Sequence, residues 1–147
     1  MKNFLAKQTI WSYILIASAI LLIPGFIIFA INTTTGYFYG SGLDPLVATL
    51  SIVAIVLGIV LAIFGDKLGK WAGVGALLIA IMSAICIGGV AWSIESVVGD
   101  IFFIPVNYPE SEDTAWALTI VTLVFYILAF VGSTAVTFSG KLFKEAE

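Results

Sequence analysis

The spacing of the charged residues constrains this chain most, because it leaves four long uncharged apolar runs. As an α-helix, the first run of 22 residues would extend about 33 Å, enough to cross a hydrocarbon core of about 30 Å. Charged residues make up only 10% of the chain, too few to cover the surface of a soluble domain. The sequence therefore predicts one all-α membrane domain over residues 1–147, a four-transmembrane-helix bundle. Its predicted spans are residues 10–31, 46–64, 71–92 and 115–138.

A cleaved signal peptide is the alternative interpretation of the first run. Such a peptide has an apolar core of only about 7–15 residues, followed by a small-x-small cleavage site. The run is longer than this, and Phe29-Ala30-Ile31-Asn32 at its end offers no such site. We therefore expect a retained helix, kinked near its outer end by Pro24.

The lysines all fall on one side of this four-span arrangement. The positive-inside rule then places both termini and the turn at residues 65–70 in the cytoplasm. A short first loop at residues 32–45 and a longer, acidic second loop at residues 93–114 would lie outside. We expect a multi-pass protein of the plasma membrane. The lysines are Lys2, Lys7, Lys67, Lys70, Lys141 and Lys144.

Small residues recur at every fourth position of the third run. Residues four apart lie nearly above one another in a helix, so they form a ridge that drifts slowly around the axis. Ridges of this kind let two membrane helices approach closely. We therefore predict that the third helix is central and that the ridges of the second and third helices face each other near the short turn at residues 65–70. The predicted helix-packing residues are Ala72, Ala76, Ala80, Ala84 and Gly88, with Ala54, Gly58 and Ala62.

The composition excludes several kinds of chemistry. The chain has no histidine and no arginine, which excludes imidazole metal sites, histidine-based catalysis and arginine-rich voltage sensors. Its single cysteine, Cys86, is interpreted as a small apolar core residue. No Asp, Glu or Lys lies within the four runs, which argues against a pump or an ion-coupled transporter. We predict no catalytic residue, cofactor or metal site, and no nucleic-acid partner.

Polar residues of the fourth run follow three-and-four spacing and would share one face of its helix. They are Thr119, Thr122, Tyr126 and Ser133. Hydroxyl groups in membrane helices commonly bond to their own backbone or to a neighbouring helix. We favour this interpretation over the alternative, in which the stripe lines a substrate pathway.

Aromatic and bulky apolar residues in the two outer loops form a predicted docking surface. Part of this cluster can lie in the headgroup layer without any partner. The apolar segment at residues 101–104 is flanked by acids and prolines, and it must be covered by protein, lipid or a partner. The predicted partner-binding residues are Tyr37, Phe38, Tyr39, Ile101, Phe102, Phe103 and Tyr108.

These features favour a small non-enzymatic accessory or scaffolding subunit of a larger membrane complex. Its partners would be the lipid bilayer and other membrane subunits or copies of itself. The alternative is a small transporter or channel subunit that acts as a homo-oligomer, with the pathway between protomers. An enzyme ranks third, because no nucleophile, base or oxyanion donor accompanies the loop carboxylates.

The topology predicts which positions an impermeant thiol reagent reaches from outside the cell. In a variant without Cys86, single cysteines at Ser41 and Ser111 should be labelled, whereas cysteines at Gly69 and Ala146 should not. Labelling of intact cells measures this directly. Reaction at Gly69 from outside would exclude the four-span orientation.

Overall fold

A computed structural model describes residues 9–39, 42–93, 95, 98–99, 103 and 110–139. Within these residues four helices are long and apolar enough to cross a membrane, which confirms the all-helical, multi-pass prediction. A short 3-10 helix, η1 (Gly36–Phe38), follows the first of them. The four helices are α2 (Ile10–Thr34), α3 (Pro45–Leu68), α4 (Trp71–Ser93) and α6 (Glu110–Ser139).

Side-chain caps explain where two of the helices begin. The Thr9 hydroxyl accepts a hydrogen bond from the Ser12 backbone N–H, and the Ser12 hydroxyl accepts one from the Thr9 backbone N–H. The Asp44 carboxylate accepts from the backbone N–H groups of Leu46 and Val47, at 2.8 and 3.2 Å. Asp44 and Pro45 thus open α3. Their residue types predict this start, because Asp caps free backbone N–H groups and Pro fits the first helical position.

Three helices extend well beyond the predicted apolar runs. α3 continues from Pro45 to Leu68, into the turn predicted at residues 65–70. α2 continues through Pro24 and ends at Thr34, so Asn32 lies in the helix and not in the first loop. α6 begins at Glu110, ahead of the predicted start of the fourth span. The helices exceed these runs because hydropathy marks only the part of a helix that faces lipid. At the start of α6, acidic residues such as Asp113 can lie within the helix because they suit the positive end of its dipole.

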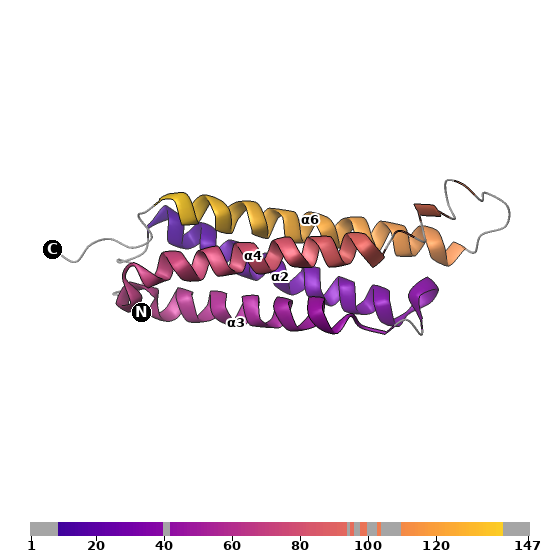
Figure 1. The fold of residues 1–147 in the computed structure, drawn as a ribbon, viewed down its shortest axis with the longest axis horizontal. Coiled ribbons are helices and arrows are strands. Elements are labelled where there is room, and N and C mark those ends of the chain that lie inside the picture. Colours follow the sequence, from indigo (N-terminus) through magenta and orange to yellow (C-terminus); the bar gives the residue numbers. More distant parts are fainter. Residues whose placement is uncertain are drawn as a thin grey trace.

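The helices form an antiparallel bundle in which each contacts its neighbours in the chain (Figure 1). α6 returns against α2 and closes the ring, whereas α2 and α4 lie diagonally opposite with little contact. Ile10, Lys70 and Ser139 share one end of the bundle, which we call the lysine end (Figure 1). Thr34, Asp44 and Ser93 share the other, which we call the loop end. That the lysine end faces the cytoplasm stays a prediction.

Exposed aromatic side chains gather at both ends of the bundle. Trp71 and Phe138 are exposed at the lysine end, and Trp92 and Tyr39 at the loop end. Trp and Tyr prefer the two membrane–water interfaces, where an aromatic ring meets both acyl chains and headgroups. The long sides of the bundle between these belts expose mainly Ile, Val and Leu, as a surface in contact with acyl chains does.

Buried positions alternate in steps of three and four along the helices. This repeat of about 3.5 residues is that of left-handed coiled coils and most helical bundles. On α6 the buried residues are Ala115, Thr119, Thr122, Tyr126, Ala129, Ser133 and Val136. On α3, Val47, Ser51, Ala54, Gly58, Leu61 and Gly65 follow these steps, with Ala48 buried beside them. On α4, Ala72, Ala76, Ile79, Ser83, Cys86 and Val90 follow the same steps.

The predicted ridge of α4 therefore leaves the interior partway along the helix. Ala72, Ala76 and Ala80 are buried, whereas Ala84 and Gly88 are exposed. Each step of four residues turns the ridge about 40° beyond a full circle, so it rotates away from the bundle axis. Within this chain, packing along the ridge ends at Ala80.

That the two small ridges face each other near the turn at residues 65–70 stays a prediction. Ala54 and Gly58 are buried and Ala62 is half-buried, but the backbone of Gly58 lies closest to Ala19 of α2. Between α3 and α4, a glycine of one helix receives a large side chain of the other. A Cβ added at Gly75 would lie 2.7 Å from Leu61 Cδ1, and one at Gly89 would lie 2.5 Å from Val47 Cγ2. Large side chains fill the spaces that small ones leave, which gives dense packing.

Leucine substitutions on α4 test where the ridge leaves the interior. Ala76→Leu should destabilise the bundle by about 1–3 kcal/mol, because the added carbon atoms have no space at a fully buried position. Ala84→Leu is the matched control, and it should leave the stability of the monomer unchanged because its side chain is exposed. Thermal unfolding of the monomeric fraction in detergent measures both. Equal losses for the two variants would contradict the observed burial.

Candidate functional site

The polar stripe of α6 faces the interior of the bundle. Thr119, Thr122, Tyr126 and Ser133 are all fully buried, as their shared spacing leads one to expect. Thr122 Oγ1 donates to the Leu118 carbonyl at 2.8 Å, and Ser133 Oγ donates to the Ala129 carbonyl at 2.7 Å. These two hydroxyls are therefore satisfied by their own helix.

A buried amide joins α2 to α6 near the loop end. Asn32 Nδ2 donates to Thr119 Oγ1 at 2.8 Å and to the Ala115 carbonyl at 3.1 Å. The Thr119 hydroxyl in turn donates to the Ala115 carbonyl at 2.7 Å. Both N–H donors of the amide are thus used, which matters because an unpaired buried donor is costly.

Sequence reasoning missed the role of Asn32 because it placed this residue in a loop. The available signal was its position, seven residues after Gly25 and ten after Leu22, on the same buried face of α2. Asn32-Thr33-Thr34 also matches a glycosylation acceptor pattern. The folded chain does not present this asparagine for modification, because its side chain is buried against α6.

A second polar contact joins three helices deeper in the bundle. Ser51 Oγ of α3 lies 2.5 Å from the Tyr126 hydroxyl of α6, and it also donates to the Val47 carbonyl at 2.6 Å. Because the Ser51 proton is engaged in this way, Tyr126 is the donor to Ser51. Cys86 Sγ of α4 lies 3.6 Å from Ser51 Oγ and 3.7 Å from the Val47 carbonyl oxygen.

The interior of the bundle is densely packed. Val47, Ile79 and Tyr126, from three different helices, are all fully buried. Among the described residues, no three His, Cys, Asp or Glu side chains are grouped to hold a metal ion. In the same residues, Thr134 Oγ1 is the one buried side-chain oxygen or nitrogen without a hydrogen-bond partner.

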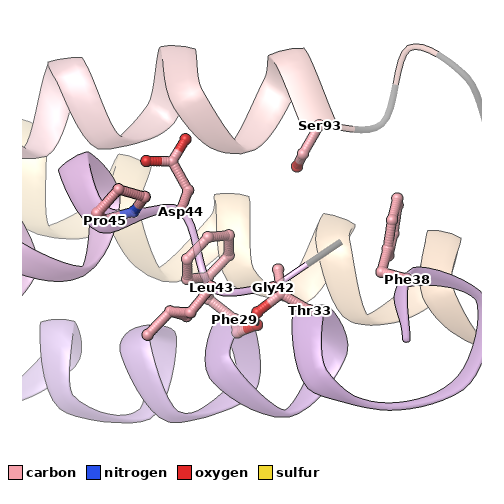
Figure 2. Close-up of a pocket in the computed structure, with 8 residues that line it drawn as sticks. All are labelled: Phe29, Thr33, Phe38, Gly42, Leu43, Asp44, Pro45 and Ser93. Atoms are coloured by element: carbon pink, nitrogen blue, oxygen red, sulfur yellow. Dashed lines mark hydrogen bonds between the residues drawn. The ribbon is translucent and has the colours of Figure 1, made fainter. Parts of the chain in front are cut away.

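A pocket of about 310 Å³ opens at the loop end (Figure 2). Its apolar walls come from the end of α2, from η1 and from the segment that leads into α3. Its polar side chains are Thr33, Asp44 and Ser93, drawn from three different elements. The lining residues are Phe29, Thr33, Phe38, Gly42, Leu43, Asp44, Pro45 and Ser93.

The described residues of the predicted docking surface differ in exposure. Phe38 is buried against Ala115 of α6 and contacts the ring of Tyr37 edge to face, with ring centroids 5.2 Å apart. Phe38 is therefore a wall of the pocket and not an exposed contact. Tyr39 and Phe103 are 80% and 81% exposed. The predicted residues Ile101, Phe102 and Tyr108 lie outside the described residues.

Comparison of the chain with protein-family models, curated proteins and solved structures finds no match in any of the three. The geometry of the bundle and of its loop end is therefore the basis for assigning a role.

A double-mutant cycle can measure how much the hydrogen bond between Ser51 and Tyr126 contributes to the free energy of unfolding. Ser51→Ala and Tyr126→Phe should each cost about 0.5–1.5 kcal/mol, and the double variant should cost less than their sum. The expected coupling is about 0.6 kcal/mol, a typical value for an interhelical hydrogen bond in a membrane protein. Reversible unfolding in mixed micelles measures these free energies.

The control cycle pairs Ser51→Ala with Ser133→Ala, because Ser133 bonds only to carbonyls of its own helix in the contacts described. These two substitutions should be additive. Additive losses for Ser51 and Tyr126 as well would show that their contact contributes no stability.

Proposed function

We propose that this protein is a non-enzymatic subunit of the plasma membrane that packs against other membrane helices in a larger assembly. The observation that carries the proposal is a stripe of small residues on the outward face of α4. Ala84, Gly88 and Ala91 are exposed and follow steps of four and three. A Cβ added at Gly88 would meet no atom within 4 Å.

This stripe interrupts a surface that is otherwise bulky. Leu77, Ile81 and Ile85 are exposed on the same helix, and large aliphatic side chains cover the outward face of α3. Acyl chains gain little from a small residue, whereas a second helix can approach its backbone closely and gain van der Waals contact. The stripe therefore suits a protein helix better than lipid.

The alternative function, a transporter or channel subunit active as a homo-oligomer, would also use this face. A pathway between protomers requires polar groups on the outward surface. Along α3 and α4, which are described throughout, Thr49 is the one exposed hydroxyl between Leu46 and Trp92. This favours packing over transport, and it makes a scaffolding or accessory role the first proposal.

Aromatic side chains at the loop end extend the proposed contact beyond the membrane core. Trp92 is exposed at the loop end of α4, and Tyr39 and Phe103 are also exposed side chains of the loop end. Aromatic residues are enriched at protein interfaces, where their large rings contribute contact area. We include Tyr39 and the segment 101–103 in the proposed partner surface, and we leave the buried Phe38 out of it.

Leucine substitutions on the stripe test the proposal. A variant with Ala84→Leu and Gly88→Leu should still fold, but it should lose a partner or a second copy that co-purifies with the wild type in mild detergent. Ala117→Leu is the matched control, since Ala117 is an exposed small residue on α6, away from the stripe. Light scattering with mass spectrometry of the purified material gives the composition.

The composition of the assembly also separates the two functions. A stoichiometric second protein supports the accessory subunit, whereas a closed homo-oligomer that conducts ions in liposomes supports the alternative. An assembly that persists unchanged in the double leucine variant would exclude the α4 stripe as its interface.

A further inference from the structure

The pocket lies at the loop end of the bundle, away from the described lysines. The chain has no Lys, Arg or His between Lys7 and Lys67, or between Lys70 and Lys141. Lys67 and Lys70 lie where α3 and α4 meet at the lysine end, whereas Asp44, Glu95 and Asp113 lie near helix ends at the loop end. A ligand at the loop end therefore meets carboxylates, and within the described residues no lysine lies there to offset their charge.

The polar side chains of the pocket are all hydrogen-bond acceptors. Thr33 Oγ1 donates its one proton to the Phe29 carbonyl at 3.0 Å, and Ser93 Oγ donates to the Val90 carbonyl at 2.7 Å. Only lone pairs of these two oxygens remain for a ligand, as for the Asp44 carboxylate. α2 and α4 end beside the pocket and α3 begins there, so the partial negative charge of two carbonyl ends meets the partial positive charge of the α3 N-terminus, which the Asp44 carboxylate caps.

The remaining walls are apolar and aromatic. Phe29, Phe38 and Leu43 line the pocket together with Asp44 (Figure 2). Aromatic faces attract cations, and apolar walls suit the hydrocarbon part of a ligand. A divalent metal ion fits poorly, because it prefers several oxygen ligands and the pocket offers one carboxylate.

We propose that this pocket binds an alkylammonium group, with the charged nitrogen at Asp44 and the hydrocarbon stem against Phe29, Phe38 and Leu43. The ammonium supplies the donors and the positive charge that the pocket lacks. The volume of about 310 Å³ is at the lower end of the range for small-molecule sites, which suits a short amine. The same chemistry is offered by a free amine and by the headgroup of phosphatidylethanolamine. This inference does not depend on the proposed assembly role.

Calorimetric titration of the purified full chain with hexylammonium tests the proposal. The wild type should bind hexylammonium, and it should bind the uncharged analogue hexanol much more weakly. Asp44→Asn should weaken hexylammonium binding about tenfold, the loss expected when a charged hydrogen-bond partner is removed. Asn is also a good N-cap, so α3 should remain folded, and Asp44→Ser provides a second uncharged cap.

Asp113→Asn is the matched control. This substitution also removes one negative charge, but Asp113 is an exposed residue near the start of α6 and does not line the pocket. It should leave the affinity for hexylammonium unchanged. Equal binding by wild type, Asp44→Asn and Asp44→Ser would overturn the proposal. So would an equal loss in Asp113→Asn, because binding would then reflect general surface charge.

A second arm distinguishes the two sources of the ammonium. The titration is repeated in phosphatidylcholine nanodiscs with and without phosphatidylethanolamine. If the lipid headgroup occupies the pocket, phosphatidylethanolamine should weaken the apparent affinity for hexylammonium in the wild type. If the ligand is a free amine, the two curves should coincide.

Discussion

Close contact between helices is the constraint on which the rest of this structure depends. Inside a bilayer, burial of apolar side chains gives little drive to association, because acyl chains are as apolar as leucine. Packing and hydrogen bonds between helices must hold the bundle together. The chain meets this with glycines that receive neighbouring side chains, as at Gly58 against Ala19 and Gly75 against Leu61. Buried residues spaced three and four apart keep these contacts continuous along each helix.

Hydrogen bonds add specificity to this packing. Asn32 fixes the position of α2 against α6, and Ser51 with Tyr126 fixes α3 against α6. Each contact pairs groups that would otherwise be unsatisfied in an apolar interior, so a shifted helix would lose the bond and leave a buried polar group. The interior is consequently well packed, and the surfaces that we propose for partners and ligands are the outward face of α4 and the loop end.

The charged residues are separated along the bundle axis, and the two ends of the bundle therefore differ in charge. Among the described residues, Lys67 and Lys70 lie at the lysine end, and the loop end has carboxylates without a basic residue. By the positive-inside rule, this separation predicts that the lysine end faces the cytoplasm. At the loop end, the Asp44 carboxylate caps the first turn of α3 and also lines the pocket. We propose that the same residue binds the cationic group of a ligand.

The sequence by itself determined the four spans and the cap at Asp44, because hydropathy, charge and helix-end chemistry are local properties. It also placed Thr119, Thr122, Tyr126 and Ser133 on one face of a helix, since spacing alone decides which residues share a face, and the structure shows that this face is buried. Only the tertiary structure decided that Ala84 and Gly88 leave the interior, that Asn32 reaches α6, and that Phe38 lines a pocket with Ser93. These outcomes depend on how each helix is rotated toward its neighbours, and rotation is set by contacts between residues far apart in the chain.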